Sequence, residues 1–251
     1  MTLWDQMLRS FIGEYKQHPA NFLRQPTISN TVHPNCNALA LLYYNDMLKD
    51  SFFNSQILPE LSDSSIGHPF EFSILPRCSP LTIQHAYHLY LIKTHLGIFL
   101  PDDASHIVEI GGGYGNLCRL VKNFGYTGKY TIVDFPEMLT IQQEYLDKVA
   151  ISDVDFSTLN MEQFTPTDKD TSVLIATFSV NEMPMKTRVH MEPHYNKYDY
   201  LFFAHNTVFD GIDNMEYFNN LKSQLQDNFD IEYFKDTHKT AWFMLCKKKG
   251  L

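Results

Sequence analysis

Apolar positions recur along this chain with spacings that differ from one segment to the next. Over residues 1–20 they recur every three to four positions, which predicts an amphipathic helix packed as a core or lid element. The same spacing over residues 38–48 predicts a second helix. Residues 51–79 hold three prolines among serines and aromatic residues, which favours an irregular cap. The Ser79-Pro80 pair then predicts the start of a helix that Gly97 ends.

From residue 105 onward, short apolar runs alternate with helical spacing. Strands are predicted at 106–110, 130–134, 154–156, 172–179 and 198–204. Asp213 is a predicted helix N-cap, and the last two runs, 229–234 and 240–246, must pair antiparallel because the turn between them is short. We predict an α/β fold with a Rossmann-like seven-stranded sheet, a terminal antiparallel β-hairpin and an N-terminal, mainly helical cap. The cap takes residues 1–79 and the sheet domain residues 80–251.

A glycine-rich turn follows the first predicted strand. Gly111, Gly113 and Gly115 stand at alternate positions, which lets the backbone turn tightly and approach a ligand closely. Asp134 ends the next strand, about 20 residues downstream, where an acid binds ribose hydroxyls. Such a turn suits a dinucleotide or S-adenosylmethionine. Asn116 stands where a dinucleotide fingerprint has its third glycine, which favours S-adenosylmethionine.

Composition excludes several classes of function. The net charge of −9 argues against a nucleic-acid substrate. No apolar run is long enough to span a bilayer, the N-terminus lacks the apolar core of a secretory signal, and the four cysteines are scattered. We therefore expect a cytoplasmic protein with reduced thiols and no membrane insertion. His190 and His194 have metal-ligand spacing, but Pro193 between them argues against a shared helical face, so no metal is predicted.

Candidate catalytic groups follow the fourth and fifth strands. Glu182 and His205 are the leading candidates for a general base or an acceptor-binding group, with Asn181 and Asn206 as hydrogen-bonding partners, because open α/β sheets bind ligands at these strand ends. The alternatives are a helix cap for Glu182 and a core imidazole for His205. Three further histidines could lie near a substrate, although turn or helix-surface positions explain them as well: His33, His85 and His88.

Four motifs together resemble a known family. They are Val108-Glu-Ile-Gly-Gly-Gly-Tyr-Gly-Asn116, Val133-Asp-Phe-Pro-Glu137, Thr177-Phe-Ser-Val-Asn-Glu-Met-Pro184 and Gly211-Ile-Asp-Asn-Met-Glu-Tyr-Phe218. Over residues 80–250 the chain resembles the class I S-adenosylmethionine-dependent methyltransferases, and within them the bacterial sugar O-methyltransferases found with capsule and polysaccharide genes. The resemblance implies S-adenosylmethionine as cofactor and a sugar or capsule precursor as small-molecule acceptor. It implies these cofactor-binding residues: Glu109, Gly111, Gly113, Tyr114, Gly115, Asp134, Phe135, Asn160, Met161 and Ser179.

Several alternatives stay open on the sequence. An amine, a phosphate or phosphoramidate ester, or a secondary-metabolite hydroxyl could be methylated on the same sheet. A nicotinamide-dependent reductase and a non-catalytic methyltransferase-like subunit are further alternatives, and the residues do not decide whether the chain forms a homo-oligomer.

Overall fold

The computed structural model describes residues 3–158 and 171–251. The chain divides into two compact units. The helical unit comprises Met1–Leu91, Gly113–Asn123 and Ile141–Ser152, and the sheet unit comprises Ile92–Gly112, Phe124–Thr140 and Asp153–Leu251. The predicted domain boundary after residue 79 stays a prediction.

The helical unit contains the helices predicted over residues 1–20, over residues 38–48 and from Ser79-Pro80 onward, and further helices beside them. They are α1 (Leu3–Gln17), η1 (Phe22–Arg24), α2 (Pro26–Asn30), α3 (Asn37–Met47), η2 (Phe53–Ile57), η3 (Leu58–Glu60), α4 (Pro80–Leu91) and α6 (Asn116–Asn123), and α7 (Pro136–Lys148) belongs partly to each unit. Tyr43 of α3 stacks on Tyr87 of α4 at 3.9 Å between ring centroids. The predicted start of α4 is confirmed, because the Ser79 hydroxyl accepts a hydrogen bond from the Thr82 amide at 3.2 Å.

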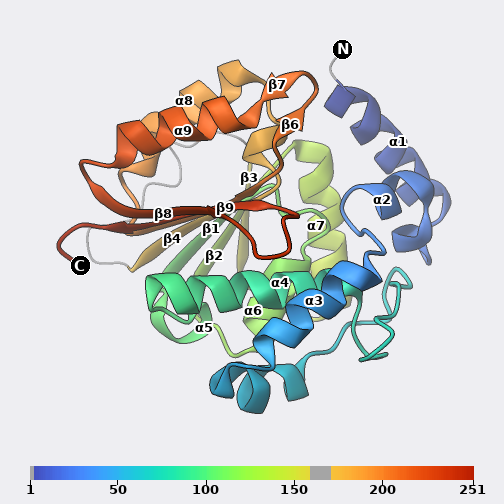
Figure 1. Ribbon diagram of the computed structural model, residues 1–251. Helices are drawn as coiled ribbons and strands as arrows, with labels where there is room; N and C mark the ends of the chain where they lie inside the picture. Colours follow the sequence, from blue (N-terminus) through green and yellow to red (C-terminus); the bar gives the residue numbers. More distant parts are fainter. Residues whose placement is uncertain (1–2, 159–170) are drawn as a thin grey trace. The chain divides into compact units, whose positions relative to one another are not determined.

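The sheet unit is built on one seven-stranded sheet, ordered β3-β2-β1-β4-β5-β9-β8. The strands are β1 (His106–Ile110), β2 (Lys129–Val133), β3 (Val154–Ser157), β4 (Ser172–Thr177), β5 (Tyr200–His205), β8 (Phe229–Lys235) and β9 (Trp242–Lys248). The first five pair in parallel, whereas β9 is antiparallel to both β5 and β8. The predicted seven-stranded sheet with a terminal antiparallel hairpin is therefore confirmed (Figure 1).

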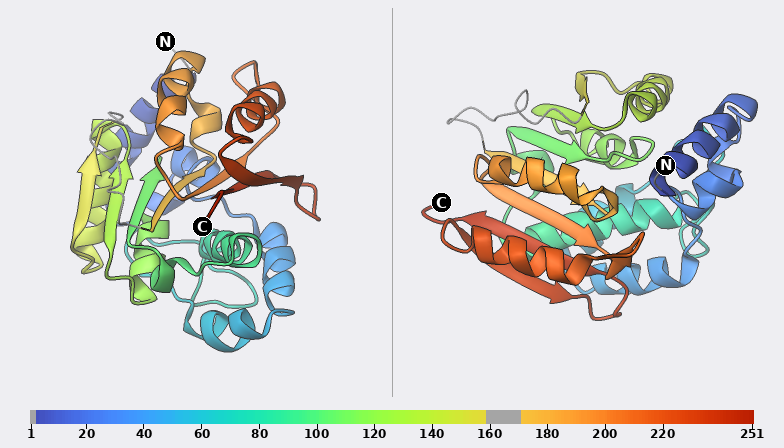
Figure 2. Two further views of the ribbon diagram at one scale, coloured as in Figure 1. Left: turned by 90° about the vertical axis from the view of Figure 1, so that its left-hand side faces the viewer. Right: turned by 90° about the horizontal axis from the view of Figure 1, so that it is seen from above.

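Helices α8 (Met185–Tyr195) and α9 (Asn214–Leu225) cover one face of this sheet (Figures 1 and 2). Leu174, Leu201 and Phe203 from the strands share a buried apolar cluster with Met191 of α8 and Phe218 of α9. Strands β1, β4 and β5 are buried almost throughout, which agrees with their largely apolar sequences. In the described part of this unit, the remaining short helices are η4 (Ile92–Leu96), α5 (Leu100–Asp103) and η6 (Val180–Glu182).

Two local expectations were wrong, and one small hairpin was not predicted. Helix α8 continues through Pro193, and the His190 and His194 rings lie one turn apart with centroids 6.2 Å from each other. His85 and His88 are buried in α4 and do not lie on a helix surface. Strands β6 (Val208–Phe209) and β7 (Ile212–Asp213) form a small hairpin that the pattern of apolar residues did not predict.

Candidate active site

The carboxyl ends of four neighbouring strands bring most of the predicted site residues to one edge of the sheet unit. Glu109 is the last but one residue of β1, Asp134 directly follows β2, and residues 178–182 follow β4. His205 ends β5. Because these strands are parallel and adjacent, their ends share the edge at which open α/β sheets bind ligands.

The glycine turn has the backbone conformation that its sequence predicts. Gly111, Gly113 and Gly115 have φ of 75°, 58° and 98°, a left-handed region that disfavours residues with a side chain. At Gly111 the neighbouring chain adds a second requirement, since a Cβ there would lie 2.3 Å from the Cβ of Ser179. The Ser179 hydroxyl in turn donates a hydrogen bond to the Ile110 carbonyl. Gly111 therefore lets the turn after β1 pack against the turn after β4.

Two carboxyl groups lie at the ends of β1 and β2. Glu109 is only 2% exposed, and its Oε2 accepts a 2.8 Å hydrogen bond from the Tyr130 hydroxyl. The pKa of Glu109 is raised to about 7. Burial is the largest cause, the hydrogen bond from Tyr130 opposes it, and the charge of Asp134 adds to it. Asp134 is also buried, and its Oδ1 accepts a hydrogen bond from the Phe135 amide at 2.8 Å.

Glu182 stands in the turn that follows β4. It is half-buried in η6, and burial raises the pKa of its carboxyl to about 7, while the nearby Arg188 guanidinium lowers it. The alternative role of Glu182 as the cap of α8 is not seen. The N-cap residue of that helix is Pro184, and no side-chain hydrogen bond caps the helix there. A carboxyl group that titrates near neutral pH is suited to accept a proton.

His205 has the environment of a core imidazole. Its ring is fully buried, stacks on Phe218 at 3.9 Å, and its pKa is lowered to about 4 by burial. Nδ1 donates to the Asn206 carbonyl at 2.8 Å, so Nε2 accepts from the Tyr233 hydroxyl, which lies 3.1 Å away. Both ring nitrogens therefore have protein partners, and a catalytic role for His205 stays a prediction.

Beneath these groups lies a buried arginine that the sequence analysis missed. Arg188 donates from Nε to the Met183 carbonyl at 2.7 Å, from Nη1 to Asn214 Oδ1 at 2.7 Å, and from Nη2 to the Asn181 carbonyl. None of the ion pairs between described residues involves Arg188. Arg188 lies in α8 among residues with no clear amphipathic pattern, so its burial had no sequence signal beyond its position shortly after Glu182.

The helical unit holds the other predicted residues of the glycine turn. Tyr114 is buried among aromatic rings, with edge-to-face contacts to Phe22, His33 and Tyr145. His33 Nε2 accepts from the Phe70 amide at 3.1 Å, and burial lowers the pKa of His33 to about 4. Hence His33 is a neutral, structural histidine here. Whether Tyr114, Gly113 and Gly115 bind a cofactor stays a prediction.

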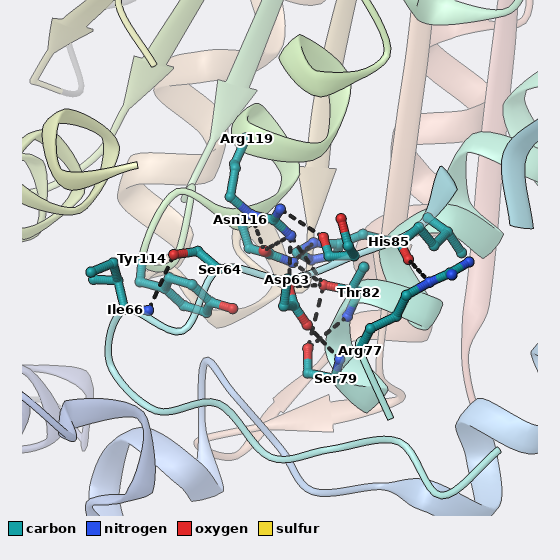
Figure 3. Close-up of polar contacts among 12 residues, drawn as sticks. Asp63, Ser64, Ile66, Arg77, Ser79, Thr82, His85, Tyr114, Asn116 and Arg119 are labelled. Carbon is teal, nitrogen blue, oxygen red and sulfur yellow. Dashed lines mark hydrogen bonds and ion pairs between the residues drawn. The ribbon is translucent and has the colours of Figure 1, made fainter. Parts of the chain in front are cut away.

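A polar network also fixes the first turn of α6 in this unit (Figure 3). Arg119 pairs with Asp63 at 2.6 Å, and both side chains are almost fully buried. Asn116 Oδ1 accepts from Arg119 Nε at 3.1 Å, while Asn116 Nδ2 donates to Thr82 and to His85 Nδ1, each at 3.1 Å. Every polar atom that this network uses has a partner within the unit, which indicates a structural role for His85.

Two predictions fall outside this description. Asn160 and Met161, the predicted adenine-binding residues, lie outside the described residues.

In the ranges that the structure covers, no group of three or more His, Cys, Asp or Glu side chains could hold a metal ion. Over the same ranges, no helix has both the length and the apolar character needed to cross a membrane.

Comparison with known proteins identifies the fold. No family model and no curated protein matches the sequence. A chain of the Pnkp1/Rnl/Hen1 RNA repair complex superposes with a TM-score of 0.51 at 11% identity, over 66% of this chain and 41% of that one. The two chains share a fold, which here is the Rossmann-like seven-stranded sheet with a terminal antiparallel hairpin.

Two further structures match with TM-scores below 0.5. An O-methyltransferase family protein from Burkholderia thailandensis gives a TM-score of 0.48 at 8% identity, over 66% of this chain and 58% of that chain. A SAM-dependent methyltransferase from Aquifex aeolicus gives 0.46 at 16% identity, over 63% of this chain and 90% of that chain. An identity of 11% to the RNA repair complex shows the fold alone, so the reaction has to be argued from the residues.

Proposed function

We propose that this chain is an S-adenosylmethionine-dependent methyltransferase that methylates an oxygen of a sugar or of a capsule or polysaccharide precursor. The observation that carries the proposal is the charge at the carboxyl ends of β1, β2, β4 and β5. Glu109, Asp134 and Glu182 stand there, whereas Arg188, which acts on the Glu182 carboxyl, is buried beneath them and bonded to two backbone carbonyls and to Asn214. Such an edge attracts a sulfonium cation, whereas the pyrophosphate of a nicotinamide cofactor would be repelled.

The proposed cofactor site uses the residues that the motifs indicated. Asp134 would accept hydrogen bonds from ribose hydroxyls, and Glu109 and Ser179 would face the amino-acid part of the cofactor. The glycine turn, Tyr114, Phe135, Asn160 and Met161 complete the proposed set. When bound, the cofactor supplies an electrophilic methyl group.

Glu182 is the proposed general base. Its carboxylate would take up the proton that the acceptor hydroxyl loses when that oxygen is methylated. A carboxyl pKa of about 7 supports this role, because the carboxylate is present at neutral pH and is more basic than an exposed one. His205 is the weaker candidate, since its fully buried ring already bonds through both nitrogens.

The sugar acceptor rests on the resemblance carried by Ser179, Glu182 and Met183. An amine, a phosphate or phosphoramidate ester, or a secondary-metabolite hydroxyl is the alternative. Methyl transfer from labelled S-adenosylmethionine to nucleotide sugars and sugar phosphates, beside amines, would separate these acceptors.

Calorimetric titration with S-adenosylhomocysteine and, in parallel, NADH tests the cofactor. We expect S-adenosylhomocysteine alone to bind, with a Kd in the micromolar range or tighter. Binding of NADH alone would replace the proposal by a reductase. Binding of neither ligand would favour a non-catalytic subunit.

A further inference from the structure

A relay of side chains joins the buried arginine to the end of β5. Arg188 Nη1 donates to Asn214 Oδ1 at 2.7 Å, and Asn214 Nδ2 donates to Asn206 Oδ1 at 2.7 Å. Asn206 directly follows β5, and Asn214 is the first residue of α9. The relay therefore connects two loops that follow neighbouring strands of the sheet.

The direction of every bond in this relay is set by Arg188. A guanidinium can only donate, so the oxygen of Asn214 must face it. The amide nitrogen of Asn214 then faces Asn206, and only the oxygen of Asn206 can accept that bond. What remains on Asn206 is Nδ2 with its two N–H groups. No hydrogen bond joins Nδ2 to a described residue, and the side chain is half-buried at the carboxyl edge.

The surroundings hold this orientation in place. Arg188 and Asn214 are both 0% exposed, and the guanidinium is also bound by two backbone carbonyls and lies 4.9 Å from the Tyr217 ring centroid. The backbone carbonyl of Asn206 accepts the hydrogen bond from His205 Nδ1. Rotating the Asn206 amide by half a turn would bring two N–H groups face to face and leave buried groups unpaired, which is costly.

We propose that Asn206 binds the acceptor and determines its chemical class, with Asn214 and Arg188 as positioning residues. This inference rests on the proposed function. The outward N–H groups of Asn206 bind an acceptor oxygen, whether of a hydroxyl, a carbonyl or a phosphate. An ammonium group, the form that an aliphatic amine has at neutral pH, can only donate and has no partner there, so Asn206 favours the binding of oxygen-bearing acceptors over protonated amines.

The orientation can be tested without any acceptor. In ¹⁵N–¹H spectra, the Asn206 and Asn214 side-chain amides are assigned by their absence from Asn206→Asp and Asn214→Asp. We expect the Asn206 protons to exchange with water at least tenfold faster than those of Asn214. Slower exchange at Asn206 than at Asn214 in the wild-type protein would overturn the assigned direction.

Asn214→Asp gives a sharper form of the test. The carboxylate that this substitution introduces can only accept hydrogen bonds, both from Arg188 and from Asn206. The Asn206 side chain must therefore turn its nitrogen toward this carboxylate and present its oxygen outward. We expect exchange at Asn206 to slow at least tenfold and Tm to stay at or above the wild-type value, because the buried arginine gains a carboxylate. Unchanged exchange at Asn206 in this variant would contradict the relay.

Turnover with the best sugar acceptor of the screen tests the binding role. We expect Asn206→Asp and Asn214→Asp each to raise KM at least tenfold while the Kd of S-adenosylhomocysteine stays within twofold. Asn220→Asp, on the exposed surface of α9, adds the same charge and should leave KM unchanged. A wild-type KM in both variants sinks the inference alone, whereas absence of turnover with every acceptor sinks the proposed function as well.

Discussion

Glu182 gives the proposed proton transfer a signature in the pH dependence of the reaction. With a pKa of about 7, the carboxylate form increases as pH rises, so kcat should be half-maximal near pH 7 and level off about one pH unit above it. Glu182→Gln should lower kcat by about 10²–10⁴-fold and remove this limb, with the affinity for S-adenosylhomocysteine nearly unchanged. Measuring kcat of both forms from pH 5.5 to 9 tests this role. If Glu182→Gln retains both the turnover and the rise of kcat with pH, Glu182 is not the base.

Glu109 should couple stability to pH. Its pKa is raised from 4.5 to about 7 in the folded chain, so the folded state binds the proton more tightly than the unfolded state does. The wild-type protein should therefore lose stability as pH rises from about 4.5 through 7. Glu109→Gln keeps an acceptor for the Tyr130 hydroxyl and carries no charge. Well above pH 7 this variant should be more stable than the wild-type protein by on the order of 3 kcal/mol, whereas near pH 4.5 the two stabilities should differ little.

Urea unfolding of both forms at pH 5 and pH 8.5 measures this difference. An equal gain at the two pH values would assign the effect to packing and not to the buried charge. If Glu109 also faces the cofactor, the same substitution should weaken S-adenosylhomocysteine binding, so stability and binding would change in opposite directions.

The turn between β1 and α6 depends on Gly111 for two separate reasons. A residue with a Cβ there must adopt a φ of 75° and must also displace Ser179, whose Cβ lies 2.3 Å from the added atom. Gly97 has a similar φ of 77° but open space around it. Gly97→Ala should cost about 1 kcal/mol, and Gly111→Ala about 1–3 kcal/mol more.

The steric part of that prediction has its own control. Ser179→Gly in the Gly111→Ala background removes the clashing Cβ and should restore part of the lost stability, which chemical unfolding measures. If the double variant is no more stable than Gly111→Ala, the left-handed backbone alone would explain the cost.

Elements with a strong local signal were predictable from the sequence. Asp213 accepts hydrogen bonds from the amides of Met215 and Glu216, as an N-cap should, and the terminal strands pair antiparallel as their short turn required. The β6–β7 hairpin was missed although Asp210 and Gly211 both have positive φ, because strands of two residues show no alternation. Helix α8 was misjudged at Pro193, where the chain remains helical near its C-terminal end.

The candidate site was predictable in position and less so in detail. Strand ends follow from the pattern of apolar runs, so the positions of Glu182, His205 and Asn206 at these ends were predictable. Burial of a single polar side chain depends on contacts far apart in sequence. Therefore neither the closed environment of His205 nor the relay through Arg188 and Asn214 could be read from local pattern.

The whole molecule carries a net charge of −9, and its proposed cofactor carries a positive charge that the product lacks. If the carboxyl groups at the strand ends face the sulfonium, S-adenosylmethionine should gain an attraction that S-adenosylhomocysteine does not feel. Salt screens such attraction over a Debye length of about 8 Å at physiological ionic strength. Between about 0.05 and 0.5 M salt, the Kd of S-adenosylmethionine should therefore rise a few-fold more than that of S-adenosylhomocysteine, as calorimetry in the absence of acceptor can measure. Parallel salt dependences for the two ligands would mean that the acidic edge does not face the sulfonium, and the charge argument for this cofactor would then fail.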